Sequence, residues 1–227
     1  MGQTGEKGGR RRLRRGLIIL AAVAAAAGGY FAVMAGLDRA PLLNAAVVDP
    51  GRLIRSGRPE PGDLEAMRER YGLATIFSVR GVEEPDVVAW ARAHGVKIVA
   101  LRMWADSPPR RDQVGLFFDV MRGDTVDLGQ YQAVIVELEG AGGRVRFPFP
   151  VLIHCDGGAD RTGVMVALYR VAFEGWSVDE AEREMIRRFH LPQFHPRLFP
   201  YLERIAPQLT PEFGSRSRPG AVPPPVK

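Results

Sequence analysis

Residues 151–173 hold the pattern that most restricts the fold of this chain, because an apolar run, a glycine-rich loop and a helix-forming segment follow one another directly. The run Val151–Ile153 predicts a buried strand, and the segment from about Thr162 to Phe173 predicts a helix. Gly157 and Gly158 stand in the short loop between them. A strand, a tight loop and a helix in this order are typical of α/β proteins.

The same alternation continues on the amino-terminal side of this unit. Short apolar runs predict further strands at 53–55, 75–79 and 96–101. Amphipathic spacing, prolines at helix starts and a Ser177–Glu180 capping box predict helices at 63–70, 85–95, 112–121, 131–138 and 177–189. Strands separated by helices indicate an α/β fold with a central, mostly parallel sheet flanked by helices.

The two ends of the chain differ from this middle part. Residues 1–16 form a basic tail with six basic residues and one acidic residue, which accounts for the whole net charge of +5. Residues 17–37 carry no charge and are long enough to predict an N-terminal transmembrane helix, with a cleaved export signal as the alternative. Residues 207–227 are rich in proline and predict a disordered tail.

This arrangement leaves residues 40–206 as the folded, catalytic domain. Because the arginines of the tail stay on the cytoplasmic side, we expect this domain to lie across the membrane, in the periplasm of a Gram-negative cell. The rest of the chain is balanced in charge, so the basic composition does not indicate a nucleic-acid partner.

Cys155 is the only cysteine in the chain, which excludes disulfides and a cysteine-based zinc site. It follows the predicted strand directly. Successive amides of a glycine-rich loop and the start of a helix bind anions, and such a field favours a thiolate over a thiol. Arg161, six residues on, has the planar fork that matches two phosphate oxygens.

These residues carry a resemblance. The sequence His154-Cys155-x5-Arg161-Thr162-Gly163 resembles the signature of the cysteine-dependent protein tyrosine and dual-specificity phosphatase superfamily. Further segments resemble bacterial dual-specificity-type members, namely residues 55–59, 78–81 and 167–177. The resemblance covers about residues 45–205, and the loop is its most specific part.

The resemblance implies a tyrosine-phosphatase-like fold and hydrolysis of phosphomonoesters through a phosphocysteine, with no metal and no cofactor. Cys155 would be the nucleophile, Arg161 would bind the phosphate, and His154 and Gly163 would support the loop. The remaining loop positions would contact the phosphate: Asp156, Gly157, Gly158, Ala159, Asp160 and Thr162.

Such enzymes also use a general acid on a loop before the signature. Asp106, in the segment 104–109 that follows the 96–101 strand, is the candidate, with Asp112 as the runner-up. Asp160 is a rival acid, because myotubularin-like and some bacterial lipid phosphatases carry an aspartate directly before the arginine. The chain also departs from compact dual-specificity enzymes by an apparent insertion around residues 123–148.

Several alternatives stay open at this point. The substrate is a phosphorylated protein, a phosphoinositide or a soluble inositol phosphate. A phosphate-binding pseudophosphatase or a rhodanese-like sulfur transferase would use a similar loop, although the intact residues of the signature disfavour both. His190 and His195 lack a third metal ligand nearby. Arg58 and Arg80 follow strand-like segments and are interpreted as ordinary surface pairs, with a place facing the phosphate pocket as the alternative.

Overall fold

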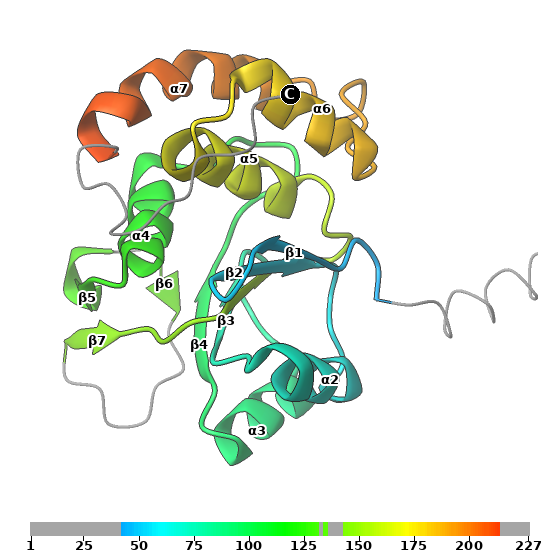
Figure 1. The fold of residues 1–227 in the computed structure, drawn as a ribbon, viewed down its shortest axis with the longest axis vertical. Helices are drawn as coiled ribbons and strands as arrows, with labels where there is room; N and C mark the ends of the chain where they lie inside the picture. Colours follow the sequence, from blue (N-terminus) through cyan, green and yellow to red (C-terminus); the bar gives the residue numbers. More distant parts are fainter. Residues whose placement is uncertain (1–41, 132–133, 136–142, 214–227) are drawn as a thin grey trace, which may run out of the picture. The chain divides into compact units, whose positions relative to one another are not determined.

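A computed structural model describes residues 42–131, 134–135 and 143–213, and Figure 1 shows their arrangement. The centre is a six-stranded sheet with the order β1-β2-β8-β3-β4-β6. Its strands are β1 (Ala46–Asp49), β2 (Leu53–Ser56), β3 (Thr75–Ser78), β4 (Lys97–Leu101), β6 (Val134–Ile135) and β8 (Val151–His154).

The four central strands β2, β8, β3 and β4 run parallel, whereas the edge strands β1 and β6 are antiparallel to their neighbours. The prediction of a mostly parallel sheet therefore holds for the centre, and the sheet as a whole is mixed. The register aligns Ser56, His154 and Ser78 across three neighbouring strands. The residues that follow them leave the sheet at the same edge, which is where ligands bind in open α/β sheets.

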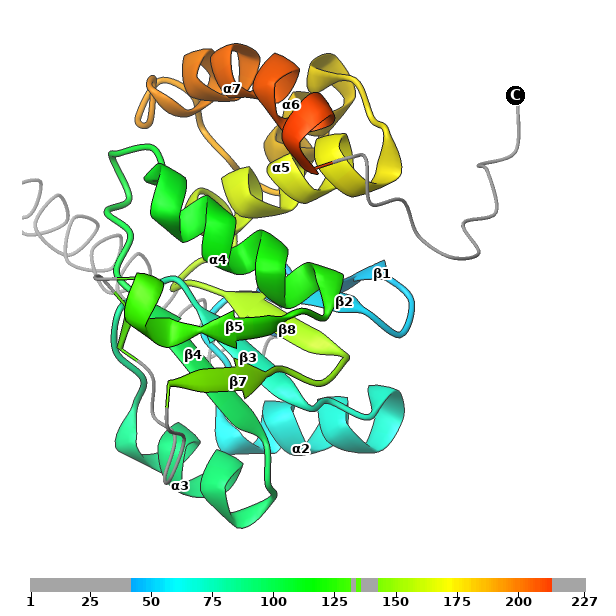
Figure 2. The ribbon, with the colours of Figure 1, turned by 90° about the vertical axis from the view of Figure 1, so that its left-hand side faces the viewer.

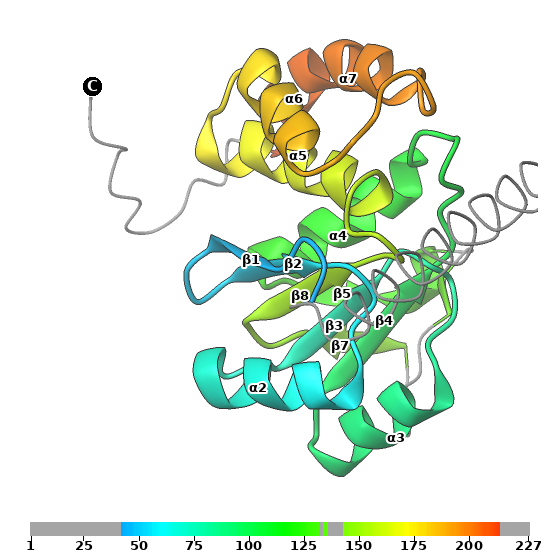
Figure 3. The ribbon, with the colours of Figure 1, turned by 90° about the vertical axis from the view of Figure 1, so that its right-hand side faces the viewer.

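Helices cover both faces of this sheet. Figures 2 and 3 show α2 (Pro61–Tyr71) and α3 (Pro85–Ala93) on one side, and α4 (Arg111–Arg122), α5 (Arg161–Glu174), α6 (Val178–Arg187) and α7 (Leu198–Phe213) on the other. Each layer has its own apolar core, one against α2 and α3 and a larger one against α4, α5 and α7. The predicted α/β layering with helices on both faces is confirmed, including the capping box at Ser177 that opens α6.

The region after α4 differs from the prediction of a helix over residues 131–138. Val134 and Ile135 form β6 beside β4, and the rest of that segment lies mostly outside the described residues. The residues 134–136 are all β-branched, and such side chains favour a strand over a helix. A small second sheet of β5 (Thr125–Asp127) and β7 (Arg144–Arg146), which the sequence did not indicate, lies in the apparent insertion.

The prediction of a disordered tail from residue 207 is wrong for residues 207–213, because α7 continues to Phe213. Leu198, Leu202, Ala206 and Leu209 are buried on one face of this helix. This spacing keeps an apolar stripe against the core, and its burial outweighs the cost of Pro207, which is exposed. Residues 214–227 lie outside the described residues.

The predicted basic tail and transmembrane helix, residues 1–37, also lie outside the described residues. Within residues 42–131, 134–135 and 143–213, no helix combines the length and the hydropathy that crossing a bilayer requires.

Candidate active site

Cys155 follows β8 directly and lies at the carboxyl edge of the parallel strands. Its side chain is buried, with 2% exposed, and the backbone N–H of Gly158 donates to its Sγ at 3.2 Å. A short loop, residues 156–160, then leads into α5, which begins at Arg161. The structure thus places the cysteine between a strand end and a helix start, an arrangement in which loop amides and a helix N-terminus bind anions.

Gly158 is a position in this loop that only glycine fits. Its φ is +65°, and a Cβ added to it would lie 2.6 Å from backbone atoms of Ser56 and Gly57. The loop therefore packs backbone to backbone against the end of β2. At Gly157, by contrast, an added Cβ would meet open space.

A second segment of the chain, residues 44–58, holds the loop from outside. Arg55 donates from Nη2 to the carbonyl oxygen of Gly158 at 2.6 Å, and Asn44 donates from Nδ2 to the carbonyl oxygen of Gly157 at 2.8 Å. The N–H of Arg58 donates to the carbonyl oxygen of Asp156 at 2.9 Å. These contacts fix the loop carbonyls outward, which leaves the amides free to face an anion.

Arg55 is fully buried on β2, where burial lowers its pKa to about 10 against the opposing effect of Glu184. Its Nη1 lies 3.7 Å from Oε1 of Glu184 on α6. The sequence indicated no site role for Arg55. The available signal was an arginine inside a short apolar strand, a place where an unpaired charge is too costly to occur.

Arg161 pairs with the carboxylate of Asp156 in the same loop, and its Nη1 lies 3.5 Å from the carbonyl oxygen of Met103. The other carboxylate oxygen of Asp156 accepts from Nε of Arg80 at 2.7 Å. Burial alone would raise the pKa of Asp156, but the two arginines hold it below its usual value. Arg80 thus contacts the signature loop, which agrees with the alternative interpretation of this residue and not with ordinary surface pairing.

Asp106 lies in the connection between β4 and α4 and is exposed. Its carboxylate accepts from Oγ of Ser107 at 3.3 Å. Because β4 is parallel to β8, this connection leaves the sheet at the same edge as Cys155, and Met103 at its start reaches Arg161. The fold therefore brings the candidate acid to the edge that carries the signature loop.

The two other acids have partners elsewhere. Oδ1 of Asp160 lies 2.6 Å from Nδ1 of His190, and its Oδ2 lies 3.3 Å from Nε2 of His195. Asp112 pairs with Arg110 at the surface. From the sequence, the two histidines suggest only a weak metal site. Their contact with Asp160 joins segments 30 or more residues apart, so no local sequence pattern predicts it.

The remaining signature residues are packed inside. Thr162 is fully buried, and its Oγ1 has no hydrogen-bond partner among the described residues. Ala159 is buried at the end of the loop. Gly163 faces α6, where an added Cβ would lie 3.5 Å from side-chain atoms of Met185. His154 is fully buried at the end of β8.

A family model described as the tyrosine phosphatase family matches residues 37–174 of this chain. The chain belongs to the tyrosine phosphatase family. The matched range contains the strand end, the cysteine, the loop and the arginine, together with the 44–58 segment that holds the loop.

One relative of this phosphatase-family chain is the dual specificity protein phosphatase TpbA of Pseudomonas aeruginosa, strain UCBPP-PA14. The two are 30% identical over 147 residues, which cover 65% of this chain and 55% of the relative. The chain thus matches about half the length of that curated relative. The same protein from strain PAO1 is 29% identical over 145 residues.

Two solved structures share the fold of this family member. The crystal structure of P. aeruginosa TpbA has a TM-score of 0.52 at 23% identity and covers 75% of this chain and 91% of its own. The core catalytic domain of the PP-IP phosphatase Siw14 from S. cerevisiae, solved with citrate, has a TM-score of 0.54 at 22% identity, covering 74% and 94%.

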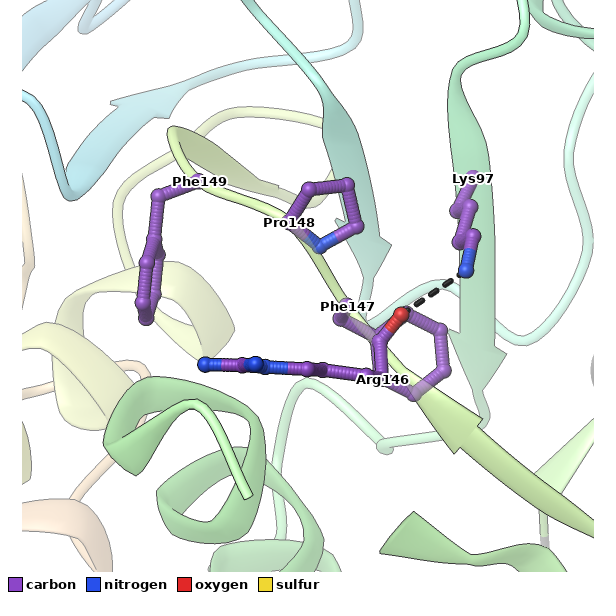
Figure 4. A pocket seen from close by; sticks show the side chains of 5 residues that line it. All are labelled: Lys97, Arg146, Phe147, Pro148 and Phe149. Carbon is purple, nitrogen blue, oxygen red and sulfur yellow. Dashed lines mark hydrogen bonds between the residues drawn. The ribbon is translucent and has the colours of Figure 1, made fainter. Parts of the chain in front are cut away.

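A separate pocket of this phosphatase-family fold lies at the opposite, amino-terminal edge of the parallel strands. Its volume is about 430 Å³, and Figure 4 shows its lining by Lys97, Arg146, Phe147, Pro148 and Phe149. Nζ of Lys97 donates to the carbonyl oxygen of Arg146 at 2.8 Å. Lys97 begins β4 and Phe149 precedes β8, so this pocket is not the site of Cys155.

Among the described residues, no group of three or more His, Cys, Asp or Glu side chains is placed to hold a metal ion.

Proposed function

We propose that this chain hydrolyses phosphomonoesters as a cysteine-dependent phosphatase of the dual-specificity type. The observation that carries the proposal is the placement of Cys155 at a strand end, with the Gly158 amide on its Sγ and Arg161 starting the next helix. Membership of the tyrosine phosphatase family and the similarity to a dual specificity phosphatase support it.

In the first proposed step, the Cys155 thiolate attacks phosphorus in line with the ester oxygen. Arg161 exchanges Asp156 for the equatorial phosphate oxygens, and the loop amides bind the same oxygens, so positioning and charge supply most of the catalysis. A sulfur–phosphorus bond forms, the phosphorus–oxygen ester bond breaks, and the leaving oxygen takes a proton from Asp106.

In the second proposed step, water attacks the phosphocysteine. Asp106, now ionised, takes a proton from that water, the sulfur–phosphorus bond breaks, and inorganic phosphate and the thiolate are released. Thr162 assists by donating its otherwise unpartnered hydroxyl to the departing sulfur.

The test is phosphate release from an aryl phosphate by the full chain and by Cys155→Ser. We expect the wild type to turn over and the variant to release no phosphate. Arg161→Lys, which keeps the charge but loses the bidentate fork, should lose most of the activity. Full activity of Cys155→Ser would overturn the mechanism, and a wild type that binds phosphate without turnover would favour a pseudophosphatase.

The same assay on a substrate panel addresses specificity. The names of two similar proteins suggest two classes of substrate, because one is a dual specificity protein phosphatase and the other is a PP-IP phosphatase. We propose a phosphorylated protein as the substrate, with phosphoinositides and soluble inositol phosphates as the alternatives. A phosphotyrosine peptide should then have the highest kcat/KM, and a higher value for an inositol phosphate would reassign the substrate.

We also propose that residues 17–37 anchor the chain in a membrane with the catalytic domain on the extracytoplasmic side. The uncharged segment and the basic residues before it support this topology. A reporter fused after Lys227 should be active only outside the cytoplasm, and a reporter active only in the cytoplasm would contradict the proposal.

A further inference from the structure

A buried acid contacts the histidine that directly precedes Cys155. Oε1 of Glu83 lies 3.2 Å from Nε2 of His154, and the side chains are 1% and 0% exposed. Glu83 belongs to the connection between β3 and α3, whereas His154 is the last residue of β8. No residue of this connection was assigned to the site from the sequence.

Burying this pair costs free energy, and a function for the pair would explain why it is present. A carboxylate and an imidazole both lose hydration inside a protein, and an apolar pair of the same volume is often at least as stable. The side chain of Ser78 and the charge of Arg80 also act on Glu83. Among the described residues, neither ring nitrogen of His154 and neither carboxylate oxygen of Glu83 has a partner that meets hydrogen-bond geometry. The 3.2 Å approach of Oε1 to Nε2 is therefore a close charge contact, and it is the ion pair that the structure gives to this ring.

Glu83 acts as an acceptor at neutral pH. Burial alone would raise its pKa, but contact with His154, with Ser78 and Arg80 adding to it, holds the pKa below its usual value of 4.5. An ionised carboxylate can only accept hydrogen bonds, so a carboxylate oxygen 3.2 Å from Nε2 favours the tautomer of His154 with its proton on Nε2. The contact therefore determines both the tautomer and the orientation of the ring.

His154 in turn transmits this constraint to the nucleophile. Its carbonyl oxygen accepts from the N–H of Val79 at 3.0 Å, and its register partners are Ser56 and Ser78. Its peptide bond continues directly into Cys155. Glu83 contacts the ring on one side, and two neighbouring strands hold the backbone. Together these contacts restrict the orientation of the strand end.

We propose that Glu83 is a positioning residue for Cys155 that acts through His154. Its carboxylate keeps the proton on Nε2 and holds the ring, and the ring holds the strand end from which the nucleophile points into the loop. This inference rests on the proposed function, because positioning Cys155 explains the buried Glu83–His154 pair only if Cys155 reacts.

The first experiment measures thiol reactivity, which needs no phosphatase activity. Because Cys155 is the only cysteine, iodoacetamide labels one site in the full chain. We expect Glu83→Ala to lower the alkylation rate at pH 7 by about tenfold, the scale found when the outer partner of a metal-bound histidine is removed. Glu83→Gln, whose amide oxygen still accepts, should lose less.

The matched control is the other Glu–His pair, Glu65 on α2 and His94 at the end of α3. Oε2 of Glu65 lies 3.5 Å from Nε2 of His94, and both side chains are about one-third exposed. Glu65→Ala should leave the alkylation rate and kcat unchanged. Equal alkylation rates for wild type and folded Glu83→Ala would overturn the proposal.

Steady-state kinetics separate positioning from binding. Arg161 and the loop amides are intact in Glu83→Ala, so kcat should fall by about tenfold while KM stays within about twofold. A rise in KM with kcat unchanged would overturn the proposal. If Cys155→Ser keeps full activity, the proposed function fails, and the alkylation result still decides whether Glu83 acts on the thiol.

A measurement on the wild type covers the case in which Glu83→Ala does not fold. Nitrogen-15 shifts of the histidine rings report which nitrogen carries the proton, and the four histidines can be assigned with single variants. We expect the neutral ring of His154 to carry its proton on Nε2. A neutral His154 ring with its proton on Nδ1 alone would overturn the inference.

Discussion

The guanidinium of Arg161 pairs with the carboxylate of Asp156, five residues before it in the same loop. Arg80, from the end of β3, binds the other oxygen of that carboxylate at 2.7 Å. In the proposed mechanism, a substrate phosphate therefore replaces Asp156 on Arg161. Asp156 is more than half exposed, so the contact is weak enough to exchange.

Asp156→Asn should strengthen phosphate binding. An exposed ion pair contributes about 0.2–1 kcal/mol, so we expect the KM for an aryl phosphate and the inhibition constant of inorganic phosphate to fall by about 1.4- to fivefold. Steady-state kinetics with phosphate as a competitive inhibitor measure both. An increase in both constants would show that Asp156 orients Arg161 instead of competing for it.

The two candidate acids are distinguished by their dependence on the leaving group. Asp106→Asn should lower kcat by about 10²–10⁴-fold for a poor leaving group, because general acid catalysis supplies that range, and by less for a nitrophenolate. Asp160→Asn should show no such dependence, since His190 and His195 hold both of its oxygens. The opposite pattern would transfer the acid role to Asp160, and the same leaving-group dependence in Asp112→Asn would transfer it to Asp112.

The glycines of the loop should respond differently to alanine. Gly158→Ala forces a Cβ to within 2.6 Å of the backbone at Ser56 at a φ of +65°, so we expect a loss of about 1–3 kcal/mol in unfolding free energy or more, and a large loss of activity. Gly157→Ala meets open space and should stay within about 0.5 kcal/mol. Urea unfolding of both variants measures the difference, and equal stability would contradict the close packing of the loop on β2.

Arg55→Met should destabilise the protein strongly. The change leaves the carbonyl oxygen of Gly158 and the carboxylate of Glu184 with one donor fewer inside the protein, and breaking a buried pair costs about 3–5 kcal/mol. Exposed Arg58→Met is the control and should cost little. If the two variants unfold at the same urea concentration, Arg55 does not hold the loop.

Glu83 should make stability fall in acid. Its folded-state pKa lies below the ordinary value of 4.5, so its contribution is complete above that value and is lost as the pH falls through the folded pKa. We expect the wild type to lose more unfolding free energy between pH 6 and pH 4 than Glu83→Gln, as measured by urea unfolding at each pH. An equal loss would contradict an ionised Glu83 in the native protein.

Local patterns were sufficient for the elements that surround the site. The apolar run before Cys155, the two glycines and the amphipathic helices predicted a strand, a loop and α5 close to their observed bounds. The short strands β5 and β7 were missed, because three residues carry too little periodicity to distinguish a strand from a loop. The whole of α7 was missed, and residues 207–213 were assigned to a disordered tail, because local composition does not contain the burial of residues such as Leu209.

The sequence by itself determined the chemistry of the loop, because Cys155, the glycines and Arg161 lie within seven consecutive residues. Only the tertiary structure showed what holds that loop. Arg55 and Arg80 contact the loop, and Glu83 contacts His154 directly before Cys155, although all three are about 70 to 100 residues away along the chain. They come together because the parallel strands β2, β8 and β3 end at one edge of the sheet. That alignment depends on strand order and register, which result from packing the whole sheet between two layers of helices and not from any local pattern.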